Sequence, residues 1–279
     1  MKEWVEEDGR VLTCAEVAPG HGCIEVLAPG LAARALPGQF AMARSGTRFL
    51  ARPLSFFDID PGRGVVAFLV RAAGEGTRAL LCLRPGDGLG LAGPFGNGFP
   101  LVSGGTLLLV AGGVGVAPFP PVVRRATAAG TGVRVVLGAR TAALLLATAQ
   151  LRDAGAEVVT CTEDGSGGVR GTVSDALPGV LRDLLAGAPG GCAFACGPPA
   201  MLVAVARLCE EAGVPLYVSL EARMGCGFGV CRGCAVPAAA GGYLHVCQDG
   251  PVFPARAADL GGVARLWEHA GDGDGGGCA

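Results

Sequence analysis

The chain is poor in charge and has no block of like charges. Charged side chains make up 16% of its 279 residues, and the formal net charge is −2. A nucleic-acid-binding protein usually carries a basic patch or stripe, so the composition argues against a nucleic-acid partner. Histidine is scarce as well: His21, His245 and His269 are dispersed, without a cysteine or serine partner at a suggestive spacing. A hydrolytic triad therefore has no support, and no catalytic acid or base is predicted.

No apolar run is long and uninterrupted enough to suggest a membrane span. Hydrophobic residues make up 51% of the chain, but 49 glycines interrupt the apolar stretches. The strongest stretch, Thr106 to Val123, contains three glycines and three prolines, which indicates a buried strand, a turn and the start of a helix. The first residues are acidic where a signal peptide would be basic. We therefore expect a cytoplasmic protein without a membrane segment.

Disulfides are not expected in that compartment, because cytosolic thiols stay reduced. The twelve cysteines divide into one closely spaced group and a scattered majority. Small buried hydrophobes are the ordinary interpretation of the scattered ones, which include Cys14, Cys23, Cys82, Cys161, Cys192, Cys209 and Cys278. Metal or redox chemistry is the better explanation for the cysteines that cluster.

Turn pairs divide residues 1–100 into short apolar runs. Pro-Gly recurs, for example at 29–30 and 37–38, and Asp-Gly follows at 87–88. Short strands separated by glycine-containing turns predict a small antiparallel β-barrel domain. The expected strands are 10–17, 23–28, 40–44, 54–60, 65–70 and 88–92.

Residues 101–219 have a different pattern, in which apolar strands alternate with helices. The expected strands are 107–111, 133–138, 157–161, 193–196 and 216–219, and the helices lie near 118–129, 142–154, 172–185 and 199–212. This alternation predicts a doubly wound parallel sheet. Residues 220–257 are too short for a core of their own, so a metal centre would supply stability to this small module. Residues 258–279 are expected to form a C-terminal tail, disordered from Gly271 onward.

The clustered cysteines carry the strongest motif. Cys226, Cys231 and Cys234 have the spacing C-x4-C-x2-C, and Cys247 stands alone as a fourth. This is the plant-type pattern for a 2Fe-2S cluster, and the intervening glycines let backbone N–H groups approach its sulfurs. Zinc also accepts four thiolates, although its sites usually use two short Cys pairs. The pattern favours the cluster, with zinc and inert thiols as the alternatives.

Two glycine-rich turns follow apolar strands of the expected sheet. The first runs through Gly112, Gly113 and Gly115 to Pro118, and the second is Cys196-Gly197-Pro198. A strand that is followed by a glycine-rich turn and a helix N-terminus can bind a pyrophosphate group. Both turns would lie at the carboxyl ends of strands, where an open parallel sheet binds its ligands. Proline replaces the third glycine of the usual dinucleotide pattern, and a purely structural tight turn is the alternative.

The expected barrel contributes two weaker signals. Arg52-Pro-Leu-Ser55 begins a strand, and Arg71 is followed by Gly74-Glu-Gly-Thr77. An arginine can bind phosphate through two hydrogen bonds, and a glycine turn offers backbone and hydroxyl donors. A surface ion pair and a simple turn would explain these residues equally well in isolation.

Together these motifs resemble the ferredoxin reductase family of flavoproteins. Several sequence segments resemble more specifically the electron transfer subunits of type B dihydroorotate dehydrogenase, and this resemblance covers about residues 5 to 260. They are Arg52-Pro-Leu-Ser55, Gly74-Glu-Gly-Thr77, Gly93-Pro-Phe-Gly-Asn-Gly98, Thr162-Glu-Asp-Gly-Ser166, Ser219-Leu-Glu-Ala-Arg-Met-Gly-Cys226 and Cys247-Gln-Asp-Gly-Pro-Val-Phe253.

The resemblance implies three cofactors and a partner. FAD would bind at Arg52, Pro53, Leu54, Ser55, Leu69, Val70, Arg71, Gly76 and Thr77. NAD would bind at Gly112, Gly113, Gly115, Pro118, Cys196, Gly197 and Pro198, and a 2Fe-2S cluster at Cys226, Cys231, Cys234 and Cys247. An FMN-bearing dihydroorotate dehydrogenase catalytic subunit would oxidise dihydroorotate to orotate for pyrimidine biosynthesis. Its electrons would pass through the cluster and FAD to NAD in a heterotetramer of two subunits of each kind.

Two positions depart from the family pattern. Phe56 follows the Arg-Pro-Leu-Ser motif where a smaller aliphatic residue is more usual, and the second strand of the sheet ends at Gly138-Ala-Arg140 without the acidic residue that holds the NAD ribose. An arginine there could accept a 2′-phosphate, so the preference for NAD rests on the family. The rival functions are the flavin subunit of an NADPH:ferredoxin oxidoreductase or sulfide dehydrogenase, and a zinc-stabilised scaffold without redox activity.

Overall fold

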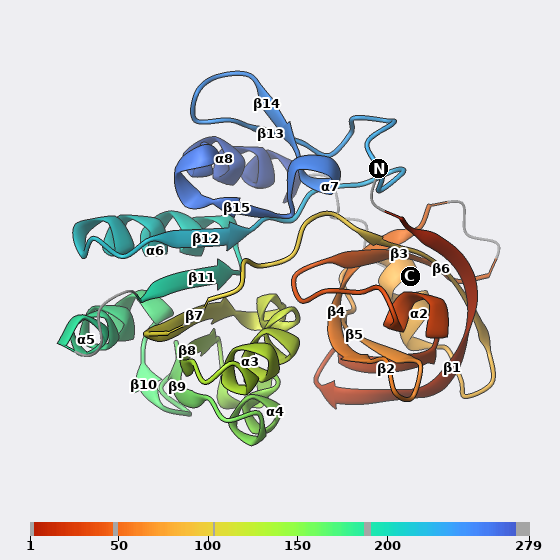
Figure 1. Ribbon diagram of the computed structural model, residues 1–279, viewed down its shortest axis with the longest axis horizontal. Coiled ribbons are helices and arrows are strands. Elements are labelled where there is room, and N and C mark those ends of the chain that lie inside the picture. The colour runs from red at the N-terminus through yellow and green to blue at the C-terminus, as the bar shows by residue number, and fades with distance from the viewer. Residues whose placement is uncertain (1–2, 47–49, 103, 187–190, 272–279) are drawn as a thin grey trace.

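The computed structural model describes residues 3–46, 50–102, 104–186 and 191–271 of the chain. A barrel, an open sheet and a small cysteine-bearing module follow one another along the chain, and Figure 1 shows the module lying above the junction of the other two. Among the described residues, no helix combines the length and apolar character needed to cross a bilayer.

The barrel consists of six antiparallel strands that close on themselves. They are β1 (Val5–Ala18), β2 (His21–Leu27), β3 (Phe40–Arg44), β4 (Arg52–Asp60), β5 (Val65–Arg71) and β6 (Gly88–Phe95), in the order β1-β2-β5-β4-β3-β6. Alternation along β2 shows why they form a barrel: Ile24 and Val26 are fully buried, whereas Glu25 between them is only partly buried. All six expected strands are present, with short helices α1 (Pro29–Ala32) and α2 (Glu75–Leu81) between them.

The second unit is a doubly wound sheet of the expected kind. Its strands are β7 (Thr106–Gly112), β8 (Gly132–Ala139), β9 (Glu157–Thr162), β10 (Val169–Arg170), β11 (Cys192–Cys196), β12 (Leu216–Ser219) and β15 (Val252–Pro254), in the order β10-β9-β8-β7-β11-β12-β15. All neighbours are parallel except β12 and β15. The chain moves outward from β7 in one direction and then from β11 in the other, which makes the β7–β11 boundary a topological switch point.

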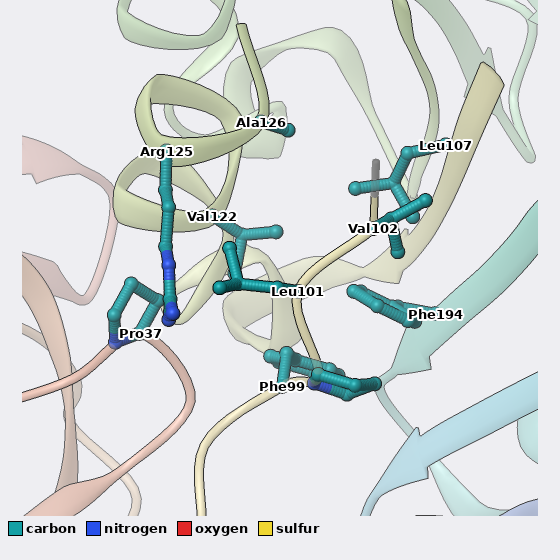
Figure 2. Close-up of a pocket in the computed structure, with 10 residues that line it drawn as sticks. Pro37, Phe99, Leu101, Val102, Leu107, Val122, Arg125, Ala126 and Phe194 are labelled. Atoms are coloured by element: carbon teal, nitrogen blue, oxygen red, sulfur yellow. The ribbon is translucent and has the colours of Figure 1, made fainter. Parts of the chain in front are cut away.

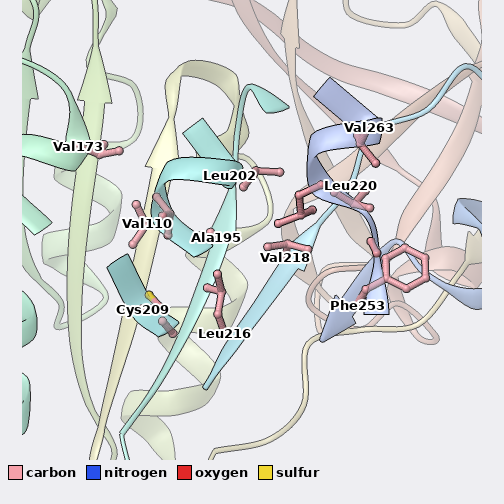
Figure 3. Close-up of a cluster of buried hydrophobic side chains, with 14 of the residues drawn as sticks. Val110, Val173, Ala195, Leu202, Cys209, Leu216, Val218, Leu220, Phe253 and Val263 are labelled. Carbon is pink, nitrogen blue, oxygen red and sulfur yellow. The ribbon is translucent and has the colours of Figure 1, made fainter. Parts of the chain in front are cut away.

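Each face of this sheet is covered by helices, because β7 is apolar on both sides. Leu107 and Leu109 pack in the core under α3 (Phe119–Ala128) and α4 (Thr148–Asp153). Leu108 and Val110 pack in the opposite core under α5 (Val173–Ala186), α6 (Pro199–Glu211) and α8 (Leu260–Gly271). A continuous apolar strand is the expected signature of such double burial. Figure 3 shows the second core, with Val110 on its strand and Val263 on α8.

The cysteine-bearing module has no separate core. It comprises β13 (Ala235–Pro237), β14 (Tyr243–His245) and α7 (Val246–Asp249), and β15 attaches it to the sheet. Val236 and Val246 are buried in the same core as Val218 of β12 and Phe253 of β15. The module is therefore stabilised by burial against the sheet and α8 as well as by whatever its cysteines bind.

Two expectations about helices were wrong. The single helix expected at 142–154 is a 3-10 turn, η2 (Ala142–Leu144), followed by α4, because Leu146 turns into the core and Ala147 adopts a left-handed φ of 59°. The tail expected from 258 contains α8 as far as Gly271, and Leu260 and Val263 on this helix are buried. The rest of that tail, 272–279, lies outside the described residues.

An aromatic seam joins the segment after the barrel to the sheet. Phe99 stacks on Phe194 of β11 with ring centroids 4.6 Å apart and lies 5.7 Å from Phe119 of α3. Figure 2 shows Phe99 and Phe194 side by side below Leu101 and Val122. The cavity between these side chains is only about 20 Å³, which is room for about one water molecule. The seam is thus a packed contact and not a ligand site.

We expect Phe194→Ala to lower the free energy of unfolding by about 3–5 kcal/mol, because it deletes a fully buried ring. Leu185→Ala, at a side chain that is 58% exposed on α5, should change it by less than about 0.5 kcal/mol. Urea unfolding followed by circular dichroism, with the same ligand concentrations for each protein, measures both. If both variants lost the same free energy of unfolding, the aromatic seam would not be a stabilising contact.

Candidate functional site

A large cavity lies where the barrel, the sheet and the cysteine module meet. Its volume is about 580 Å³, within the range of roughly 300–1,000 Å³ typical of ligand pockets. It covers the switch point between β7 and β11, where an open α/β sheet usually binds its ligand. The predicted residues on its wall are Pro53, Leu54, Ser55, Leu69, Arg71, Gly112, Gly113, Gly115, Pro118, Cys196, Gly197 and Pro198.

The two glycine-rich turns are packed directly against each other at this switch point. A Cβ on Gly115 would lie 2.4 Å from the backbone oxygen of Cys196, and one on Gly112 would lie 2.9 Å from Cδ of Pro198. Gly197 has a φ of +159°, and a Cβ there would lie 3.0 Å from the nitrogen of Gly112. Glycine is needed at these positions because the backbones approach too closely for a side chain. The turns therefore form one continuous surface, as their positions in the sequence predicted.

The barrel supplies the other wall through β4 and β5. Four of the nine residues predicted to bind FAD are absent from that wall: Arg52, Val70, Gly76 and Thr77. Arg52 covers the start of α2, since a Cβ on Gly76 would lie 2.4–2.7 Å from its guanidinium group. Val70 is buried in the barrel core, so any contact it makes with a ligand in the cavity would come from its backbone.

Thr77 has a local structural role that the sequence did not distinguish from binding. Its hydroxyl oxygen accepts hydrogen bonds from the backbone N–H groups of Ala73 and Gly74 and donates one to the Gly74 oxygen. These contacts cap the first turn of α2. The Gly74–Thr77 segment, expected as a turn, is therefore the beginning of a helix.

Several cavity residues escaped the sequence analysis as site residues. Phe40, Ser219, Glu221 and Trp267 line the cavity, although the phrase from Ser219 to Cys226 had been noted for its family resemblance. Trp267 was missed because it lies in the region expected to be a tail. Only the position of α8 against α6 brings its side chain to the cavity.

The cavity wall beyond β8 carries one positive and one negative side chain. Arg140 and Glu163 both line the cavity, and the backbone nitrogen of Glu163 donates to the Ala139 oxygen at 3.2 Å. This hydrogen bond holds the segment after β9 against the end of β8. An acidic side chain is therefore available near the end of the second strand, even though it does not follow that strand in sequence.

A thiol and a carboxyl group on the cavity wall, those of Cys196 and Glu221, interact with each other. Desolvation raises the pKa of the Cys196 thiol to about 12, and the charge of Glu221 adds to this increase while a hydrogen bond with Ser219 opposes it. Desolvation also raises the pKa of the Glu221 carboxyl, with the Arg71 guanidinium opposing. Cys196 is thus held as a neutral thiol on the wall and is not a nucleophile at neutral pH.

The four clustered cysteines lie in two pairs at the edge of the module. The sulfur atoms of Cys234 and Cys247 are 3.3 Å apart and buried. Cys226 accepts hydrogen bonds from both the backbone and the side chain of Cys231. A 2Fe-2S cluster takes two thiolates on each iron, so two thiol pairs suit it. Within the described parts of the chain, no three His, Cys, Asp or Glu side chains converge to hold a single metal ion.

Backbone N–H groups favour a thiolate at the first cysteine. Desolvation opposes ionisation of Cys226, but hydrogen bonds from the backbone of Cys231, Phe228 and Val230 outweigh it and lower its pKa to about 7. Glycines also lie beside the sulfur of Cys231, since Cβ atoms on Gly225 and Gly233 would be 3.4 and 3.7 Å from it, in ordinary van der Waals contact. The donor set, the N–H groups and the glycine positions together fit an iron–sulfur cluster.

A closed six-stranded barrel and a doubly wound sheet that share one cavity define an oxidoreductase of the ferredoxin-reductase type. Two family models match the chain: the oxidoreductase NAD-binding domain over residues 109–207, and the iron-sulfur cluster binding domain of dihydroorotate dehydrogenase B over residues 221–259. The chain belongs to the family of electron transfer subunits of dihydroorotate dehydrogenase B. Its cofactors are FAD, a 2Fe-2S cluster and NAD, and it works with a catalytic partner subunit.

The similarity extends over most of the chain. An electron transfer subunit of dihydroorotate dehydrogenase B (NAD(+)) from Desulforamulus reducens is 38% identical over 254 residues, which cover 88% of this chain and 95% of that one. The subunit from Geobacillus thermodenitrificans is 40% identical over 229 residues, covering 78% and 85%. A solved structure of an NADH-dependent reduced ferredoxin-NADP oxidoreductase superposes with a TM-score of 0.84 at 28% identity and covers 94% of each chain.

The cysteine module offers a matched pair of glycine substitutions. Gly227 and Gly241 have similar positive φ angles, +85° and +88°, but a Cβ on Gly227 would lie 2.5 Å from Cγ of Met42, whereas a Cβ on Gly241 meets nothing within 4 Å. We expect Gly227→Ala to lower the iron content per chain at least twofold, because the loop must lift from β3. Gly241→Ala carries the same backbone strain and should retain the wild-type content. Iron and acid-labile sulfide assays measure the cluster content per chain. Equal cluster content in the two variants would show that the close contact between Gly227 and Met42 is not needed for cluster binding.

Proposed function

We propose that this chain passes electrons from dihydroorotate, oxidised on an FMN-bearing catalytic subunit, to NAD⁺ in the synthesis of UMP. The observation that carries the proposal is that one cavity spans the barrel and the nucleotide-type turns and is also lined by Met224, two residues before the first of the four cysteines. The family relatives, which are named as subunits of this enzyme, support the identity of the donor. We expect a cytoplasmic heterotetramer with two subunits of each kind.

The proposed cofactor positions follow the geometry of the cavity. FAD would lie along β4 and β5, held by Pro53, Leu54, Ser55, Leu69 and Arg71, with its phosphates towards Arg52 and Gly76 at the start of α2. NAD would lie across the joined turns formed by Gly112, Gly113, Gly115, Pro118, Cys196, Gly197 and Pro198. Cys226, Cys231, Cys234 and Cys247 would ligate the cluster.

The side chains have binding and insulating roles in this scheme. When bound, the cluster relays single electrons, FAD exchanges one or two electrons, and NAD⁺ accepts a hydride. Arg71 supplies a positive charge at the cavity wall, and Leu54 and Leu69 give that wall an apolar surface. Cys196 remains protonated and so adds no charge where the nicotinamide would lie. Glu163 could accept hydrogen bonds from the NAD ribose in place of the missing acidic residue after β8.

A second candidate is the flavin subunit of an NADPH:ferredoxin oxidoreductase. It is favoured by the superposition on a ferredoxin-NADP oxidoreductase over 94% of each chain and by Arg140, which could accept a 2′-phosphate. The two candidates share FAD and the 2Fe-2S cluster but differ in their electron donor and in the use of NAD or NADP, so a donor-dependent assay with each nucleotide separates them.

The test of the proposal is co-purification with the candidate catalytic subunit, followed by dihydroorotate-dependent NAD⁺ reduction. Cys231→Ser should abolish both the cluster signal and the coupled reaction, because it removes an exposed ligand without disturbing the core. It should leave NADH oxidation by an artificial dye, which needs only the flavin. Cys82→Ser changes another exposed thiol far from the cluster in sequence and should behave as wild type.

Two results would decide against parts of the proposal. NAD⁺ reduction without dihydroorotate dependence would remove the pathway assignment and leave the cofactor assignments standing. A colourless protein that contains zinc and no flavin would favour the scaffold alternative.

The joined turns predict a separate effect on NAD binding. Gly115→Ala must push the Cys196–Gly197 turn away, since its Cβ would lie 2.4 Å from a backbone oxygen. We expect the KM for NADH to rise about tenfold or more, because displacement of the turn by a fraction of an ångström misplaces the bound nucleotide. Gly132→Ala, whose Cβ would meet only Thr106 at 3.6 Å, is the matched control in the same sheet. An unchanged KM for Gly115→Ala would place NAD elsewhere.

A further inference from the structure

Four aromatic rings connect the large cavity with the cysteine loop, which we define as residues 225–234. Phe40 lines the cavity and lies 5.9 Å from Phe95, measured between ring centroids. Phe95 lies 6.1 Å from Phe228, which is inside the cysteine loop between Cys226 and Cys231. Trp4 contacts both of these rings: it is stacked on Phe228 at 5.6 Å and lies 5.5 Å from Phe95.

The barrel holds three of these rings in place through its strand pairing. Phe40 of β3 is paired both with Phe95 of β6 and with Ser55 of β4, which is predicted to bind FAD. Val5 is paired with Gly93 of β6, which places the preceding residue, Trp4, beside Phe95. Figure 1 shows the beginning of the chain lying next to the blue cysteine module. Phe228 is the only one of the four that belongs to the loop.

The loop rests on the barrel at a second point next to these rings. A Cβ on Gly227 would lie 2.5 Å from Cγ and 2.9 Å from Sδ of Met42, and 3.4 Å from the ring of Phe95. The loop backbone therefore touches the barrel surface just before Phe228, whose ring contacts both Phe95 and Trp4. The loop residue with the most exposed large apolar side chain is Val230, at 74%, whereas Phe228 is 46% exposed. Phe228 thus packs on its own chain, and Val230 faces outward.

We propose that Phe40, Phe95, Phe228 and Trp4 form an aromatic bracket that positions the cysteine loop relative to the cavity. Trp4 and Phe228 are positioning residues: neither lines the cavity, and neither offers a cluster ligand. The bracket holds the loop at a constant separation from the flavin position, because Phe40 is part of the cavity wall and Phe228 is part of the loop. This inference rests on the proposed function, which assigns the cluster to the loop and FAD to the cavity.

The test compares the full chain, loaded with flavin and cluster, as wild type, Trp4→Ala, Trp4→Phe and Phe228→Ala. Hydrogen–deuterium exchange of a peptide spanning 225–234 reports how firmly the loop is docked, independently of turnover. Stopped-flow bleaching of the cluster absorbance after mixing with NADH reports electron delivery to it. Tyr243→Ala is the control, because Tyr243 is an aromatic residue of the same module that is 71% exposed.

Loss of one aromatic pair corresponds to roughly a 2- to 12-fold change in the docked population. We expect Trp4→Ala and Phe228→Ala, each of which removes two ring contacts, to speed exchange of the loop by at least that factor and to slow cluster bleaching by at least twofold. Trp4→Phe should restore both to near the wild-type values, and Tyr243→Ala should leave both unchanged. NADH oxidation by an artificial dye should persist in every variant.

The bracket is refuted if Trp4→Ala and Phe228→Ala exchange and bleach like wild type, or if Tyr243→Ala matches them. Failure of the proposed function is a different result: a wild-type chain that binds no flavin or cluster, or that gains no dihydroorotate-dependent activity with the partner. Loop exchange in the wild type and the variants still tests the bracket in both cases, because it reports docking of the loop independently of turnover.

Discussion

The arrangement of this molecule depends on one shared apolar core. The cysteine module is too small to bury its own side chains, and Val236 and Val246 are buried instead with β12, β15 and α8. The same core includes Cys234 and Cys247 and extends to the barrel side chains Phe40, Met42 and Phe95. Burial of this kind is the dominant favourable term in folding. It couples the barrel, the sheet and the module, so the positions of the three proposed cofactor sites are linked to one another.

Close backbone packing is the second constraint on the site. The two glycine-rich turns touch at the switch point, where a side chain on Gly115 would overlap the Cys196 backbone. This contact joins two segments about eighty residues apart into one surface at the carboxyl ends of β7 and β11. A rigid, preorganised surface lowers the cost of ordering a bound nucleotide. The barrel then covers the other side of the cavity through Leu54, Ser55 and Leu69.

The electrostatics of the site are consistent with cofactor chemistry rather than with acid–base catalysis by side chains. Cys196 is kept protonated by desolvation and by Glu221, whereas Cys226 is shifted towards the thiolate by backbone N–H groups. The two thiols therefore differ in pKa because their surroundings differ, although each is adjacent to a glycine in the sequence. The first suits a neutral wall for a nucleotide, and the second suits a ligand for iron.

Local patterns in the sequence determined much of this protein: six strands of the barrel, five of the six parallel strands, both glycine-rich turns and the spacing of the four cysteines. The alternation of apolar and polar residues and the effect of turn residues extend over only a few positions, so both can be recognised without a structure. Tertiary packing decided the remainder. Burial of Leu146 interrupts the expected helix at 145–147, and packing against the sheet makes 260–271 helical. The Thr77 side chain caps the first turn of α2. Tertiary packing also brought Trp4, Phe95 and Phe228 together, because contacts between distant segments depend on how the barrel and module dock, which no local pattern encodes.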